Sequence, residues 1–323
     1  MTAFITRRLI QTLIVTILLS IVAFGVMQLM PGDPLDAMIS SIPDITAEDI
    51  ARLKEIYEVD KPFHLRYLDW ISGVVQGDLG YSRTYRVPVE DLVWDRLINT
   101  TLLSGFAMVL ALIIGIPLGV FSGLKPNSKL DYTANFTAFA GISTPSFFLA
   151  LLLIMIFASG LKWFPASGTI DPGYSGMGFW EQMGDRFSHL VLPVISLTAL
   201  QMGVYVRYAR SSMMEAMRND FIRTARAKGM SPKTVVWIHG FRNALIPIIT
   251  IVALSLSFLF SGSLITETVF SYQGIGQFLY TAIMNSDYNA AMVSFMITII
   301  MVLLMNLIAD VLYAVVDPRI SYS

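Results

Sequence analysis

The chain has 323 residues, of which 55% are hydrophobic and 14% are charged, and its formal net charge is -1. Soluble globular proteins carry about 25% charged residues, so this composition excludes an ordinary soluble protein and indicates a protein that resides in a lipid bilayer. The chain contains no cysteine, which excludes disulfides, thiolate metal sites and cysteine nucleophiles.

Six apolar segments are each long enough to cross about 30 Å of hydrocarbon as a helix of about 20 residues, which predicts an all-α integral membrane protein with six transmembrane helices. The first segment follows two arginines, as a secretory signal does. Its apolar run is too long for a signal and lacks a small-residue cleavage pattern, so we expect it to be retained. The fourth is interrupted by Pro193 and Gln201, but omitting it would place the most basic segment outside the cell. The segments are Leu9–Met30, Thr101–Ser122, Thr133–Ser159, His189–Val206, Ala244–Gly262 and Ala290–Val315.

The charges are distributed unevenly between the connecting segments. With a cytoplasmic N-terminus, the inner segments hold thirteen Lys/Arg and four Asp/Glu, whereas the outer segments hold nine and eighteen. Basic residues are retained on the cytoplasmic side of membranes. The distribution therefore predicts that both termini are cytoplasmic.

The outer segment 31–100 is large enough to form an extracytoplasmic cap. It holds thirteen acidic and seven basic residues, and helical patterns at Ala47–Tyr57 and Pro62–Val75 are followed by the turn sequence Gly77–Gly80. The segment is either a solvated connection or a surface that binds a partner. We divide the chain accordingly into residues 1–100, the first transmembrane helix with the extracytoplasmic segment, and residues 101–323, a five-helix core.

A basic segment, Glu215 to Asn243, lies between the fourth and fifth spans. We expect Asp220 to cap a short helix, Gly229 to end it in a left-handed conformation, and Ser231 with Pro232 to begin a second helix. A helix, a tight turn and another helix at a membrane surface predict a docking element, with contact to anionic lipid headgroups as the alternative. Two acids face eight basic residues across this segment and its edges: Arg207, Arg210, Arg218, Arg223, Arg226, Lys228, Lys233 and Arg242.

Polar residues inside the spans are candidates for a translocation pathway, although hydroxyl groups at such positions also hydrogen-bond between helices. Asp310 differs from them, because an intramembrane carboxylate is costly. It lies near the cytoplasmic end of the last span, and we expect a gating or structural ion-pair role. Gly115 and Gly119, continued by Gly123, predict close helix packing. The pathway candidates are Thr198, Gln201 and Tyr205 on the fourth span and Thr250, Ser257 and Ser261 on the fifth.

Catalytic and cofactor motifs are missing from the sequence. No lysine follows a glycine, so the chain has no phosphate-binding P-loop, and it has neither His-Glu-x-x-His nor Gly-x-Ser-x-Gly. Gly274-Ile-Gly276 lacks the third glycine of a dinucleotide fingerprint. The three histidines, His64, His189 and His239, have no metal-ligand spacing. We therefore expect a protein that is not an enzyme and binds no cofactor, metal or nucleic acid.

Aligned on Gly229, the basic segment resembles the coupling loop of permease subunits in binding-protein-dependent ABC importers. Ala225 and the glycine match the general pattern, Glu-Ala-Ala, three residues and Gly. Arg-Thr-Ala-Arg-Ala-Lys-Gly at 223–229 and Arg-Asn-Ala-Leu-Ile-Pro at 242–247 are typical of the oligopeptide/dipeptide branch. Further blocks similar to the B-type subunit of that branch are Met30–Pro34, Gly77–Gly80, Thr144–Phe147, Phe164–Gly168, Glu267–Phe270 and Asp317–Arg319.

The resemblance implies a type I ABC importer permease in a bacterial or archaeal cytoplasmic membrane. It implies a second, C-type permease chain, two cytoplasmic ATPases that carry ATP and Mg²⁺, and an extracytoplasmic solute-binding protein. The expected substrate is a di- or oligopeptide; nickel complexes, glutathione and oligosaccharides remain alternatives. An ion-coupled secondary transporter is disfavoured, since the chain shows one intramembrane acid and no repeat. Coupling to the ATPase is expected in the loop 207–243 through Arg223, Thr224, Ala225, Arg226, Lys228 and Gly229.

Overall fold

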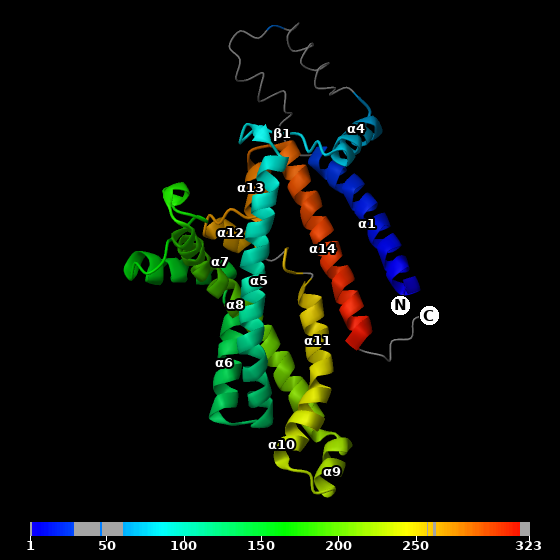
Figure 1. Ribbon diagram of the computed structural model, residues 1–323, viewed down its shortest axis with the longest axis vertical. Helices are drawn as coiled ribbons and strands as arrows, with labels where there is room; N and C mark the ends of the chain where they lie inside the picture. The colour runs from blue at the N-terminus through cyan, green and yellow to red at the C-terminus, as the bar shows by residue number, and fades with distance from the viewer. Residues whose placement is uncertain (1, 29–45, 47–60, 257, 261–262, 317–323) are drawn as a thin grey trace.

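The structure is a computed structural model that describes residues 2–28, 46, 61–256, 258–260 and 263–316. Within these ranges the chain is a bundle of helices with one short β-hairpin (Figure 1). Five helical segments are long and apolar enough to cross a membrane, and a bent helix pair raises the number to six. The five are α1 (Thr2–Gln28), α5 (Glu90–Leu124), α8 (Phe179–Arg218), Pro232–Leu256, which ends in α11 (Arg242–Leu256), and α14 (Tyr288–Val316).

The predicted third span is wrong as a single straight helix. It consists of α6 (Lys129–Ser143) and α7 (Ser146–Leu153), which continues as the π-helix η1 (Ile154–Gly160), and the two halves are bent by 103°. The bend falls at Thr144, which has an extended backbone (φ -81°, ψ 125°). Thr144 precedes Pro145, and the proline ring disfavours the helical conformation in the residue before it.

The fourth span, by contrast, is confirmed as one helix of 40 residues that continues through Pro193. It packs along α5, and the glycines of α5 make this contact close. A Cβ atom at Gly119 would lie 2.4 Å from the Val206 carbonyl oxygen, and one at Gly123 would lie 2.7 Å from the Arg210 carbonyl oxygen. Since neither position has room for a side chain, the predicted small-residue packing is confirmed.

The predicted helix Pro62–Val75 is present as α4 (Phe63–Gln76), and Gly77 ends it in the left-handed conformation (φ 89°). α4 lies against the end of α1, where the ring of Phe24 is 5.5 Å from that of Phe63 and 6.0 Å from that of Trp70. A hairpin follows, with β1 (Tyr81–Ser82) antiparallel to β2 (Val87–Pro88). The predicted helix Ala47–Tyr57 lies outside the described residues.

The last third of the described chain contains α12 (Leu264–Val269), α13 (Ile275–Met284) and α14. Buried apolar side chains of α1, α5, α13 and α14 form one core, and those of α5, α7, α8 and the residues that follow α12, Phe270 and Tyr272, form a second. In Figure 1, α4, β1 and α13 lie toward one end of the molecule. The α5–α6 turn and the basic segment lie toward the other end, and the start of α1 lies about midway along the molecule in this view. Two of the segments predicted to be cytoplasmic therefore share one end.

Candidate functional site

The basic segment folds into α9 (Asp220–Ala227), α10 (Pro232–Thr234) and the π-helix η3 (Val235–Phe241), which protrude from the lower end of the bundle in Figure 1. Gly229 has φ +73°, the left-handed conformation that favours glycine. Ser231 caps α10 by accepting the N–H of Thr234. Both turn predictions are confirmed. The cap of α9 was predicted one residue late, because Asn219 holds that position and Asp220 is the first helical residue.

The inner face of α9 anchors the segment. Ile222, Ala225 and Val235 are buried together, with Met217 of α8 packed against them. The small size of Ala225 therefore serves packing within the loop, and its side chain does not face outward with the other predicted coupling residues. The other five predicted residues are exposed: Arg223, Thr224, Arg226, Lys228 and Gly229.

The exposed face of α9 is strongly basic. Arg223 lies 3.4 Å from the Asp220 carboxylate, but both side chains are more than 80% exposed. An ion pair of this kind contributes little, because water screens it. The cations on this face are therefore available to an acidic partner.

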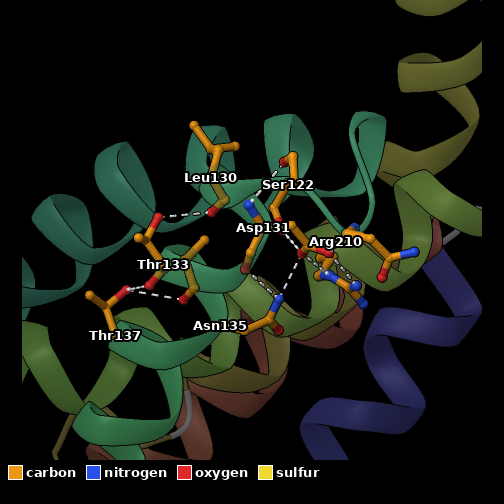
Figure 2. Close-up of polar contacts among 10 residues, drawn as sticks. Ser122, Leu130, Asp131, Thr133, Asn135, Thr137 and Arg210 are labelled. Carbon is orange, nitrogen blue, oxygen red and sulfur yellow. Dashed lines mark hydrogen bonds and ion pairs between the residues drawn. The ribbon is translucent and has the colours of Figure 1, made fainter.

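A buried ion pair braces the helix that leads into this segment (Figure 2). The carboxylate of Asp131 on α6 accepts two hydrogen bonds from Arg210 on α8, from Nε at 2.6 Å and from Nη2 at 2.9 Å. It also accepts hydrogen bonds from the hydroxyl of Ser122 on α5, the backbone N–H of Asn127 and the side-chain amide of Asn135. The Asp131 side chain is 4% exposed, so this fully bonded carboxylate ties α5, α6 and α8 together.

The sequence did not reveal this pair. Asp131 and Arg210 are separated by 79 residues, and Arg210 was counted with the cations of the basic segment. The tertiary structure shows that it is bound inside the bundle and is not part of the docking surface. The one signal of this pair in the sequence was that Asp131 is the single acid on the turn after the second span.

The pathway candidates are divided by the structure. Gln201 and Tyr205 of α8 line a cleft of about 370 Å³ together with Ile251, Leu254 and Ser255 of α11. The cleft is mostly apolar, with a few polar side chains, as small-molecule sites usually are. It lies between the spans that flank the basic segment.

Thr198 and Thr250 do not line this cleft. Thr198 is buried and donates a hydrogen bond to the carbonyl oxygen of Ala107 on α5 at 3.2 Å, so it links two helices as the alternative reading proposed. Thr250 donates to the carbonyl oxygen of Ile246 in its own helix. Ser257 and Ser261 lie outside the described residues.

Asp310 forms an ion pair, as predicted. Its carboxylate lies 3.2 Å from the guanidinium of Arg8 on α1, and the two side chains are 34% and 44% exposed. The pair joins the first and last spans. Its position on the α1–α14 contact is separate from the cleft between α8 and α11.

Glu267 of α12 is a buried acid that the sequence analysis did not single out. It is 0% exposed, and its Oε1 accepts hydrogen bonds from the hydroxyls of Thr100 on α5 and Ser263, both at 2.7 Å. Its Oε2 accepts the backbone N–H of Gln277, in the first turn of α13, at 2.9 Å. Burial raises the pKa of Glu267, while these hydrogen bonds act in the opposite direction.

The glycine pair Gly274-Ile-Gly276 makes room for this carboxyl group. A Cβ atom at Gly274 would lie 2.3 Å from the carboxyl carbon of Glu267, and one at Gly276 would lie 3.0 Å from its Oε2. The pair is therefore part of a joint between α12 and α13. This joint explains why the two glycines are present, although they do not form a dinucleotide-binding motif.

The fold and the site together define a class of protein, a multi-span membrane protein that carries an exposed basic helical segment at one end. Two solved ABC transporter structures have a similar fold, each with a TM-score of 0.53. The methionine transporter MetNI in inward-facing conformations is 18% identical, with 70% of this chain and 96% of that chain covered. An amino acid ABC transporter crystallised with histidines is 12% identical, with 69% and 94% covered.

The chain belongs to the family of binding-protein-dependent transport system inner membrane components, whose profile matches residues 115–322, and the N-terminal profile of the same system matches residues 1–104. It is 39% identical to the oligopeptide transport system permease protein AppB of Bacillus subtilis, over 100% of both chains. It is 36% identical to the dipeptide transport system permease protein DppB of Escherichia coli, over 100% of this chain and 99% of that protein.

Proposed function

We propose that the chain is a permease subunit of an ATP-driven importer that moves di- or oligopeptides from an extracytoplasmic binding protein into the cytoplasm. In this proposal a second, C-type permease chain completes the pathway, and two ATPases with ATP and Mg²⁺ dock on the cytoplasmic side. The observation that carries it is the exposed basic face of α9, held on an apolar anchor at the end of a transmembrane helix. Full-length relatives named as oligopeptide and dipeptide permeases support the choice of substrate.

The structure offers a continuous route for force from the docking loop to the cleft. Met217 at the end of α8 packs under α9, and Arg210 lies two turns earlier on α8, where Asp131 holds it to α6. Tyr205 and Gln201, which line the cleft, follow within the next three turns of the same helix. A displacement of α9 by an ATPase would therefore move α8 with the wall of the cleft. Rigid, packed elements of this kind transmit conformational change.

Proton-coupled transport by the chain alone is the competing function. Such a carrier needs an intramembrane acid that is free to titrate. Asp310, the one intramembrane acid in the sequence, is bound to Arg8. This ion pair favours the importer.

Charge reversal on the docking face tests the proposal. In proteoliposomes that contain the complete complex, with the binding protein and a radiolabelled dipeptide, we expect Arg223→Glu combined with Arg226→Glu to release the ATPase and abolish uptake. Lys129→Glu is the matched control, because Lys129 is exposed on the α5–α6 turn at the same end of the molecule. If Lys129→Glu reduces uptake equally, the loop acts through the membrane surface. Uptake by the chain without ATPases would refute the importer.

A second series separates docking from loop folding. No atom lies within 4 Å of a Cβ built on Gly229, so a side chain can begin at this position without a clash at its Cβ. Gly229→Ala adds the strain of the left-handed conformation, about 1 kcal/mol, without bulk. We expect Gly229→Trp to uncouple ATP hydrolysis from uptake while Gly229→Ala retains most transport. Normal coupled transport by an assembled Gly229→Trp complex would contradict docking at this point.

A further inference from the structure

Three potential metal ligands meet where the loop after η1 returns to α8. His189 and Asp185 lie one turn apart on α8, and Asp171 comes from the preceding loop. One ligand atom from each residue lies within 4.8 Å of the other two. The side chains of His189 and Asp185 are 2% and 6% exposed, whereas that of Asp171 is 58% exposed and opens the cluster to solvent.

The hydrogen bonds of His189 determine which ring nitrogen faces the open side. Nδ1 lies 2.9 Å from the backbone carbonyl oxygen of Asp185, which is an acceptor, so Nδ1 carries the proton. In the neutral form of the ring, the Nε2 lone pair would therefore point toward Oδ1 of Asp171, 3.6 Å away. A lone pair facing a carboxylate is repulsive, and a cation between the two atoms removes the repulsion. Metal-binding histidines in proteins have this same arrangement, with the second nitrogen bonded to a carbonyl or carboxylate.

The surrounding contacts position the two carboxylates in advance. Asp185 Oδ2 accepts the backbone N–H of Asp171 at 3.1 Å, and its Oδ1 lies 3.5 Å from Nδ1 of His189. Gln182 donates to the carbonyl oxygen of Tyr174 and holds the loop on α8. The adjacent cation, Arg186, donates to the Tyr174 hydroxyl at 2.6 Å and stacks on its ring. The cluster is thus assembled by contacts that do not depend on an ion.

The donor set suits one class of ion. Two carboxylates and one neutral imidazole carry a charge that a divalent cation balances. Mg²⁺ and Ca²⁺ prefer oxygen ligands alone, whereas imidazole favours Zn²⁺ and its neighbours. Ligand atoms around a tetrahedral Zn²⁺ with bonds of about 2.0–2.2 Å are separated by about 3.3–3.6 Å. The 3.6 Å between His189 Nε2 and Asp171 Oδ1 meets this requirement for that pair, and the three ligand atoms lie within 4.8 Å of one another, so Asp185 would draw closer on metal binding.

We propose that Asp171, Asp185 and His189 form a binding site for a divalent transition-metal ion of the Zn²⁺ type. The ion would fasten the loop to α8. The same loop is bound to α12, because the N–H of Gly168 donates to the carbonyl oxygen of Phe270 at 2.9 Å. Metal binding would therefore restrain this loop against two helices that contribute to the second apolar core. The site is independent of the ATPase docking loop and of the transported solute.

The test uses the full chain purified in detergent, treated with EDTA and then titrated with Co²⁺ as a spectroscopic probe and with Zn²⁺ by calorimetry. We expect one equivalent of each ion to bind, with the intense visible absorption of tetrahedral Co²⁺, and Zn²⁺ to raise the unfolding temperature. Asp171→Asn should weaken binding at least about tenfold. This residue is largely exposed, so its replacement leaves the packing intact, and His189→Ala provides the stronger but more disruptive change.

The other two histidines supply matched controls. His64→Ala and His239→Ala remove an imidazole elsewhere in a chain that has three histidines and no cysteine, and both should bind the ions like the unaltered chain. Equal binding by His189→Ala and Asp171→Asn would overturn the proposal. It would also be overturned if the unaltered chain bound neither Co²⁺ nor Zn²⁺.

Discussion

The contact between α5 and α8 allows a sharp test of how closely the two helices are packed. In Gly119→Ala, the added methyl carbon would lie 2.4 Å from the Val206 carbonyl oxygen and 2.7 Å from the Ala209 Cβ. Real Cβ atoms essentially never approach another heavy atom within 3.0 Å. The nearest atom belongs to the backbone and cannot rotate away, so α8 must move by at least 3.0 minus 2.4, or 0.6 Å.

The size of the expected stability loss follows from a comparison of two glycines in one helix. Gly105 is also in α5, and a Cβ there meets nothing within 4 Å. Replacing either glycine with alanine favours the helix by about 1 kcal/mol, and this common gain cancels in the difference. The overpacking at Gly119 remains and costs typically about 1–3 kcal/mol. We therefore expect Gly119→Ala to be less stable than Gly105→Ala by about 1–3 kcal/mol.

The assay is unfolding of the purified chain by SDS in mixed micelles, followed by the fluorescence of its five tryptophans. Gly105→Ala should unfold at the same SDS fraction as the unaltered chain or a higher one, and Gly119→Ala at a lower one. If the two variants unfold at the same SDS fraction, the close approach of α5 and α8 is refuted.

Three further predictions concern the carboxylates. Asp131→Asn should destabilise the chain by about 3–5 kcal/mol in the same assay, because Arg210 is left without its buried counter-charge; a loss below about 1 kcal/mol would show that water replaces the pair. Glu267→Gln should lower the stability by about 1–3 kcal/mol, since an amide cannot accept all three hydrogen bonds. In the same joint, Gly274→Ala should destabilise a Glu267→Ala chain less than it destabilises the unaltered chain. Additive effects of the two replacements would contradict this contact. Asp310→Asn should cost less than about 1 kcal/mol, because its ion pair with arginine is more than a third exposed, and a larger loss would indicate a buried role.

The third span shows where reasoning from composition is insufficient. Its apolar length predicts one transmembrane helix, and length alone does not report a bend. Pro145 was visible in the sequence, but prolines 117, 193 and 247 lie inside helices that continue. The outcome depends on whether neighbouring helices compensate for the lost hydrogen bond, which is a property of packing.

The conformation of the basic segment was largely predictable because its turns are local. Gly229 and Ser231 adopt the conformations that their own backbone and side-chain chemistry favours. Which residues of α9 face inward and which face outward was less predictable from the sequence. Ala225 turns inward because Ile222 and Val235 bury the inner side of α9, and this contact joins residues on both sides of the turn.

The sequence by itself determined that the chain belongs in a membrane, where most of its spans lie, and how the basic segment turns. These properties depend on apolar length and on the preferences of single residues, which act locally. The tertiary structure decided which charges are paired. Asp131 meets Arg210 across 79 residues, and Glu267 meets Thr100 across 167. Such contacts exist because helices pack at particular points, and one sequence without relatives contains no measure of that packing.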